Sequence, residues 1–113
     1  MGAIDTRRLT REITFGDWEK AVDAYRRSRA AAKSLEEEYA RSTDQVEGEI
    51  EPLLDSLVND WDAAMQTLLF FEAPSVAAVA IKARVVADDG VSDLDIAPAV
   101  AQAIAADLER LAA

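Results

Sequence analysis

Residues 18–39, WEKAVDAYRRSRAAAKSLEEEY, decide the fold class of this chain. Apolar residues recur there at intervals of seven, and the row continues beyond the segment: Trp18, Tyr25, Ala32, Tyr39, Val46 and Leu53. A companion row of mostly small residues follows three positions later: Ala21, Ser28, Leu35 and Ser42. This spacing places one apolar stripe along a helix, which we therefore expect to pack lengthwise on a second helix. The small companions favour a close-packed hairpin over a strong coiled coil.

The start of the first helix is indicated by Thr14 and Asp17, which stand at capping-box spacing. We therefore expect residues 1–13 to form a flexible tail and residues 14–113 to form a single helical domain.

Two positions for the end of this helix stay open. A fresh cap at Ser42 or Asp44 would give helices over 15–41 and 44–71, with a kink at Pro52. Alternatively, the helix runs on to Gly48 and breaks before Pro52. We favour the first arrangement, because helices of matched length bury both of their apolar stripes.

Two shorter helices are expected after the hairpin. Pro74 ends the second helix, and Ser75 is placed to cap a third that closes at residues 88–90. Asp93 or Asp95 is expected to open a fourth. In the third helix, we expect an inward face of Val76, Val79, Ala80, Ala83 and Val86, with Lys82 and Arg84 outward. In the fourth, Pro98 lies in the first turn and the inward stripe is Ile96, Val100, Ile104, Leu108 and Leu111.

The predicted fold class is therefore all-α, with a long antiparallel hairpin covered by two shorter helices. Its second helix carries an amphipathic stripe of Leu54, Leu57, Val58, Trp61, Ala64, Met65, Leu68 and Leu69. The most apolar stretch, residues 66–90, is divided by Glu72, Pro74, Lys82 and Arg84, so we do not expect it to span a membrane.

Composition narrows the function classes. The chain has 113 residues and neither cysteine nor histidine, which excludes disulfides, thiolate nucleophiles and imidazole bases. No glycine-rich phosphate loop or nucleophile-elbow motif occurs. We therefore expect a protein that is not an enzyme and that carries no catalytic residue and no cofactor. The N-terminal sequence lacks a secretory pattern, so the expected location is cytoplasmic.

Charge is distributed unevenly along the chain. Residues 36–62 hold ten acidic residues against Arg41 alone, a net of −9 within a total of −10. Such a block repels phosphates, so direct nucleic-acid binding is not expected, but it could imitate nucleic acid. The alternative is a solvated helix face that is partly neutralised, across the hairpin, by the basic residues of the first helix: Lys20, Arg26, Arg27, Arg29 and Lys33.

Two acidic clusters have residues of the type that bind metal ions, but neither has the pattern of a metal site. The loop 86–95 holds four aspartates around a glycine but lacks the EF-hand spacing, and helix capping explains it better. The second cluster would need histidine to complete a di-iron bundle site, and it comprises Glu36, Glu37, Glu38, Glu47, Glu49 and Glu51. No metal site is therefore predicted.

Partner-binding candidates come from aromatic and acidic residues. Phe70 and Phe71 are adjacent and cannot both face one core, so one of them is expected to be an exposed anchor for a partner. The candidate acidic contacts are Glu36, Glu37, Glu47, Glu51 and Asp55.

Two segments carry a resemblance to a known group of proteins. APSVAAVAIKAR at 73–84 and the Trp-x-x-Ala-Val-x-x-Tyr pattern at 18–25 resemble small helical proteins of sphingomonad-type alphaproteobacteria. The resemblance covers roughly residues 15–112. It implies a helical hairpin and a bacterial cytoplasmic setting, and it carries over no activity and no site.

The expected function follows from these points. We expect a non-enzymatic interaction or adaptor module that self-associates, most simply as a homodimer, because two short helices cannot cover a long hairpin. The alternative is an acidic inhibitor that imitates nucleic acid and occupies a DNA- or RNA-binding protein.

Overall fold

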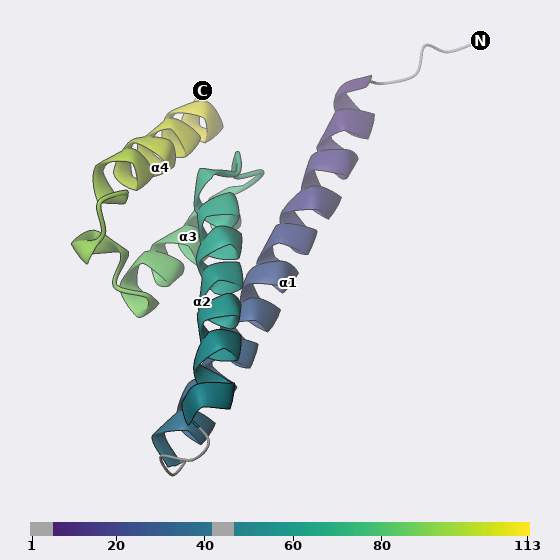
Figure 1. Ribbon diagram of the computed structural model, residues 1–113. Coiled ribbons are helices and arrows are strands. Elements are labelled where there is room, and N and C mark those ends of the chain that lie inside the picture. Colours follow the sequence, from purple (N-terminus) through teal and green to yellow (C-terminus); the bar gives the residue numbers. More distant parts are fainter. Residues whose placement is uncertain (1–5, 42–46) are drawn as a thin grey trace.

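The computed structural model describes residues 6–41 and 47–113, and the side chains of 16–41, 48 and 50–113. In chain order, the chain forms α1 (Thr6–Arg41), α2 (Glu47–Phe70), α3 (Val76–Asp88), the 3₁₀ turn η1 (Val91–Asp93) and α4 (Ala97–Ala112). No strand occurs in the described residues. The predicted all-α class is confirmed, with α1 and α2 forming a long hairpin beside the shorter α3 and α4 (Figure 1).

The seven-residue spacing correctly located the core of the hairpin. Trp18, Tyr25 and Ala32 are buried, and α2 supplies Met65, Leu68 and Leu69 to the same core. The buried part of this seven-residue row is shorter than expected. Its last member, Leu53 on α2, is 54% exposed. Val46 lies outside the described residues.

The helix boundaries agree with the sequence at one end of α1 only. α1 ends at Arg41, as in the favoured arrangement, and Pro52 lies inside α2 near its start. However, α1 begins at Thr6 rather than at Thr14, so the predicted start was wrong and the helix takes in part of the expected tail. The caps proposed at Ser42 and Asp44 lie outside the described residues.

The ends of α3 follow the sequence closely. The Ser75 side chain accepts a hydrogen bond from the Ala78 amide at 3.1 Å, which confirms Ser75 as the N-cap. Gly90 ends the turn after Asp89 in the left-handed region, with φ of 63°. Glycine reaches this conformation without steric strain, whereas other residues do not.

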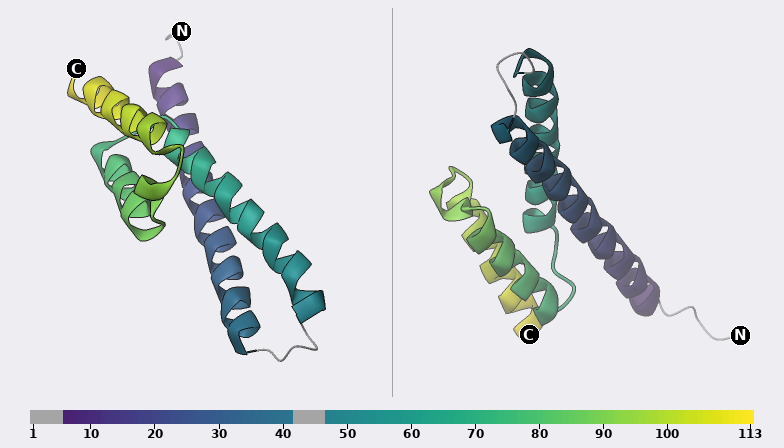
Figure 2. Two further views of the ribbon diagram at one scale, coloured as in Figure 1. Left: turned by 60° about the vertical axis from the view of Figure 1, so that its left-hand side comes forward. Right: turned by 90° about the horizontal axis from the view of Figure 1, so that it is seen from below.

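The start of α4 differs from the prediction. Its N-cap is Ile96, which makes no side-chain cap, so neither Asp93 nor Asp95 opens the helix as expected. Pro98 does lie in the first turn, where its missing amide hydrogen costs least. Figure 2 shows α4 lying beside α3 on one side of the hairpin.

The inward face of α3 was predicted correctly only in part: Val79 is buried and Val86 packs against the core, as expected, but the other positions differ. Val76 is 67% exposed, and Ala80 and Ala83 are also exposed. The buried positions are Ala78, Val79, Lys82 and Val85. Lys82, expected to face water, is fully buried. The face of α3 that carries Lys82 packs inward because the Lys82 ammonium donates hydrogen bonds to the Asp107 carboxylate and to the Phe71 carbonyl. These bonds outweigh the preference of a lysine for solvent.

The molecule is long and thin. Its principal extents are 68 × 34 × 17 Å and its Cα radius of gyration is 17.9 Å, whereas a compact domain of this length has a radius of about 13 Å. Its accessible surface of 7812 Å² likewise exceeds the roughly 6,100 Å² typical of a monomer of this mass. No helix in the described residues is long and apolar enough to cross a membrane.

Candidate functional site

An apolar groove runs along α4 on the side next to the end of α3 and η1. It has a volume of about 500 Å³ and is lined by nine residues: Val86, Val91, Ser92, Ala97, Val100, Ala101, Ile104, Ala105 and Leu108. Ser92 is the only polar residue in this lining, and no charged side chain contributes. We call it the α4 groove.

The α4 groove exists because α4 is apolar over more than one face. One side of the helix packs inward through Val100, which is 2% exposed. The neighbouring side presents Ala97, Ala101, Ala105 and Leu108, spaced by four or three residues and therefore aligned along the helix. Leu108 is 46% exposed. The small alanine side chains form the floor of this row, and the larger Leu108 side chain follows them as a ridge at its C-terminal end.

The two adjacent phenylalanines divide as predicted. Phe70 is 45% exposed, whereas Phe71 is half-buried with its ring centroid 5.9 Å from that of Trp18. Phe70 does not line the α4 groove. It remains an isolated exposed aromatic at the end of α2.

The acidic candidates do not gather at one point. Glu36 is half-buried and pairs with Lys33 on its own helix at 3.6 Å, and Glu37 on α1 is exposed. The Glu47 side chain lies outside the described ones. Glu51 and Asp55 are exposed on α2.

Glu51 and Asp55 share one side of α2 with Asp62, because positions four and eleven apart align on a helix. We call these three residues the acidic ridge. Within the described chain, the one side-chain bond to the ridge is donated by Gln66 to Asp62, at 2.9 Å.

The predicted neutralisation across the hairpin does not occur among the described residues. Arg27 pairs instead with Asp23 on α1 at 2.5 Å, and Arg29 pairs with Asp89. Lys33, besides its contact with Glu36, lies 5.1 Å from the centroid of the Trp61 ring. We expected Lys33 to form an ion pair with a carboxylate of α2, but it interacts instead with the aromatic face of Trp61.

Asp89 is a polar hub that the sequence did not reveal. Its carboxylate accepts hydrogen bonds from the Tyr25 hydroxyl at 2.5 Å, from Arg29 Nε at 2.9 Å and from Trp61 Nε1 at 3.0 Å. These donors come from α1 and α2, so one carboxylate at the end of α3 joins three helices. We expected loop aspartates to act as helix caps. Asp89 does occupy the C-cap of α3, but its side chain serves tertiary structure.

The hub shifts the acid–base behaviour of its members. Burial, reinforced by the hydrogen bond to Asp89 and its negative charge, raises the pKa of the Tyr25 hydroxyl. The hydrogen bond to Asp89 likewise raises the pKa of Arg29. Tyr25 therefore stays a neutral donor and Arg29 stays a cation over the usual pH range.

Lys82 belongs to a second buried network. Its Nζ donates to Asp107 Oδ2 at 2.6 Å and to the Phe71 carbonyl. Asp107 also accepts from the Ala73 amide at 3.0 Å and from Arg110 at 2.9 Å. This network fixes α3 and α4 to the segment that follows α2. It uses Lys82 as a structural ion rather than as an accessible nucleophile.

Among the described side chains, no group of three or more acidic residues, histidines or cysteines could hold a metal ion. The aspartates of loop 86–95 are instead spread between the hub and the solvent-exposed surface.

Comparison with known proteins adds no further constraint. No family model, no curated protein and no solved structure matches this chain.

Proposed function

We propose that this protein is a non-enzymatic helical interaction module that self-associates as a homodimer through the α4 groove. The observation that carries the proposal is an uncharged, exposed apolar groove on a molecule whose surface is too large for its mass.

The first support is the extended shape. The accessible surface exceeds that of a typical monomer of 12.3 kDa by roughly 1,700 Å². A standard interface buries about 800 Å² on each partner. Covering one face with a second copy would therefore bring the molecule toward the usual balance of buried and exposed surface.

The second support is the self-complementary relief of the α4 groove. The floor at Ala101 and Ala105 and the ridge at Leu108 lie on the same helix, so two copies related by a two-fold axis can place each ridge on the other's floor. Small residues at the contact allow helix axes to approach closely. The α4 groove of a second copy is also free of charged side chains, so covering one groove with the other buries no charge.

The proposal is tested with a matched pair of α4 variants. Ala105→Glu places a carboxylate in the groove, whereas Ala106→Glu places the same side chain next door on an exposed position outside the lining. Both changes exchange one strong helix former for another. We expect Ala105→Glu to sediment as a monomer and Ala106→Glu to sediment as wild type. Equal masses for wild type and Ala105→Glu at every concentration would refute the assignment of the interface to α4.

A second function is supported by the acidic ridge. Its carboxylates make no ion pair with described cations, as an imitation of nucleic acid would require. However, the ridge has charges four and seven residues apart, or about 6 and 10 Å along the helix. One strand of duplex carries a charge about every 3.4 Å. Because the acidic ridge has a lower charge density than a nucleic-acid strand, imitation of nucleic acid is our second proposal, after the homodimer.

Imitation of nucleic acid is tested on purified DNA- and RNA-binding proteins from the organism that produces this chain. If it is correct, the chain displaces a labelled duplex from one of them, and Glu51→Gln with Asp55→Asn weakens the displacement at least tenfold. Failure to displace nucleic acid from any of them at low salt would remove this alternative while leaving the dimer untouched.

A further inference from the structure

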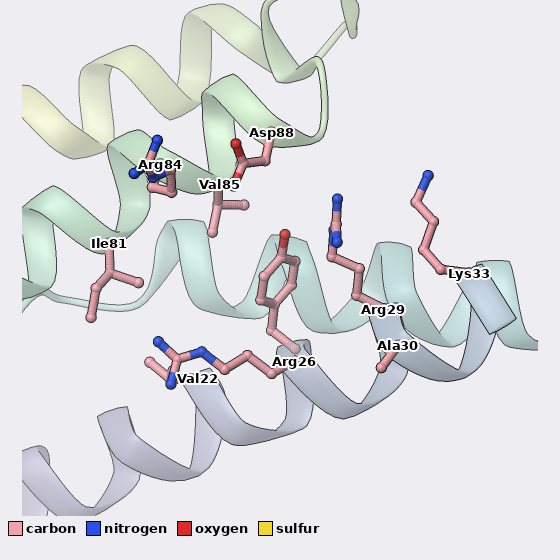
Figure 3. Close-up of a pocket in the computed structure, with 10 residues that line it drawn as sticks. Val22, Arg26, Arg29, Ala30, Lys33, Ile81, Arg84, Val85 and Asp88 are labelled. Atoms are coloured by element: carbon pink, nitrogen blue, oxygen red, sulfur yellow. The ribbon is translucent and has the colours of Figure 1, made fainter.

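A second hollow, of about 310 Å³, lies between α1 and α3 (Figure 3). Its apolar lining comes from both helices and consists of Val22, Ala30, Ile81 and Val85. Its cationic lining consists of Arg26, Arg29 and Lys33 of α1 and Arg84 of α3. Asp88 is the one acidic residue in this lining. We call this hollow the cationic groove; it shares no residue with the α4 groove.

Two of these cations are left without a carboxylate. Arg29 is held by Asp89, and Lys33 contacts Glu36. Arg26 and Arg84 form no ion pair with any described residue, although the chain carries 22 acidic residues against 12 basic ones. Each guanidinium could readily pair with a surface carboxylate in so acidic a protein. Instead, the two lie on opposite walls of one groove.

The groove continues along the same two helices into a neighbouring hollow of about 340 Å³. The two hollows share Val22, Arg26 and Ile81. The neighbouring hollow extends past Trp18 and Ala78, which are 4% and 1% exposed, to the exposed Ala77. Its acidic lining consists of Glu19 and Asp23. The charge of the combined groove therefore changes along its length: it is mainly cationic at the Arg84 end, it holds Arg26 beside apolar residues where the two hollows meet, and it is acidic at the Trp18 end.

We propose that the cationic groove binds a small amphiphilic anion. Its carboxylate or phosphate lies between Arg26 and Arg84, and its apolar stem extends over Ile81 toward Trp18. Guanidinium groups suit this head because their paired N–H donors match the oxygens of carboxylates and phosphates. The volume suits a small molecule, since ligand pockets start at about 300 Å³. Glu19 and Asp23 disfavour a ligand with a second negative charge at its far end.

The experiment uses four probes, each titrated into the full chain by calorimetry: octanoate, octyl phosphate, octanol and succinate. The two amphiphilic anions are kept below their micelle concentrations and octanol below its solubility limit. Octanoate and octyl phosphate distinguish the two possible heads, octanol lacks the charge, and succinate carries charge at both ends. Tryptophan fluorescence provides a second readout, because Arg29 and Lys33 lie over the Trp61 ring, at 5.7 and 5.1 Å. We expect one of the two amphiphilic anions to bind at least tenfold more tightly than octanol or succinate.

The matched variants are Arg26→Gln with Arg84→Gln against Arg27→Gln. Arg27 is next to Arg26 but lies outside the groove and pairs with Asp23. We expect the double variant to lose binding at least tenfold and Arg27→Gln to bind as wild type, with both variants retaining the wild-type circular dichroism spectrum. Octanol binding as tightly as the anions, no binding by either anion at millimolar concentration, or equal losses in the two kinds of variant would overturn the proposal.

Discussion

Lys82 Nζ lies 2.6 Å from Asp107 Oδ2, and the two side chains are 0% and 6% exposed. This ion pair is the central link between α3 and α4. Taking both charges out of water is costly, and the cost is offset only because the Phe71 carbonyl, the Ala73 amide and Arg110 complete the network.

Removing one member of this pair should be strongly destabilising. Lys82→Met leaves the Asp107 carboxylate buried without its main partner, and we expect a loss of about 3–5 kcal/mol in the free energy of unfolding. Urea denaturation measures it. The control is Lys82→Met combined with Asp107→Leu, which removes both charges and should recover much of the loss. A single variant as stable as wild type would show that the buried pair does not form.

The same carboxylate predicts a pH dependence. Burial alone would raise the pKa of Asp107, but hydrogen bonds from Lys82, Ala73 and Arg110 outweigh it and hold the pKa below its ordinary value. A depressed pKa contributes stability that is present above the unfolded-state pKa, about 3.9, and is lost as pH falls through the lower folded-state pKa. We therefore expect Asp107→Asn to be destabilised at pH 7 and to approach wild type below pH 4. Parallel stability curves from pH 7 to 2.5 would contradict this.

Removing the Asp89 carboxylate should lower the free energy of unfolding more than removing the carboxylate of the exposed Asp88. Asp89→Asn keeps the shape but removes the charge facing Arg29 and one acceptor oxygen shared by Tyr25 and Trp61. We expect a loss of about 1–3 kcal/mol, typical of a damaged buried hydrogen-bond network. Asp88→Asn is the matched control, since Asp88 is exposed. Thermal unfolding that ranks the two variants equally would argue against the hub.

Two glycines should respond oppositely to alanine. Gly90→Ala forces a side chain into the left-handed region, which costs about 1–2 kcal/mol even though no atom lies within 4 Å of the new Cβ. Gly48→Ala, in the first turn of α2 and equally open, should instead be stabilising, by no more than the roughly 0.5–1 kcal/mol typical of the middle of a helix. Chemical denaturation of both variants checks the sign. A stabilising Gly90→Ala would mean that the turn after α3 differs from the one described.

Sequence periodicity predicted the elements better than their contacts. The seven-residue row from Trp18 to Ala32 located the hairpin core, and Ser75 and Gly90 marked the ends of α3 through local chemistry alone. Lys82 was misplaced because a lysine on an alanine-rich helix faces water unless a distant carboxylate compensates it. That carboxylate, Asp107, is 25 residues away.

The candidate site shows the same limit. The adjacency of Phe70 and Phe71 predicted that one of the two rings is exposed but not which one, and the exposed ring is that of Phe70. The α4 groove was not predicted, because in the sequence Ala101 and Ala105 are ordinary helix formers. They become part of a groove only because α3 and η1 pack next to them. The one signal in the sequence was that α4 has more apolar positions than a single inward stripe needs, and that signal could have indicated a second packing face.

The central claim is that a second copy covers α4. Sedimentation equilibrium of the wild-type chain from 1 to 500 μM tests it most directly. We expect the weight-average mass to rise from that of one 12.3 kDa chain toward twice that value, and Ala105→Glu to remove the rise. A wild-type chain that stays at the mass of one copy throughout this range would contradict it.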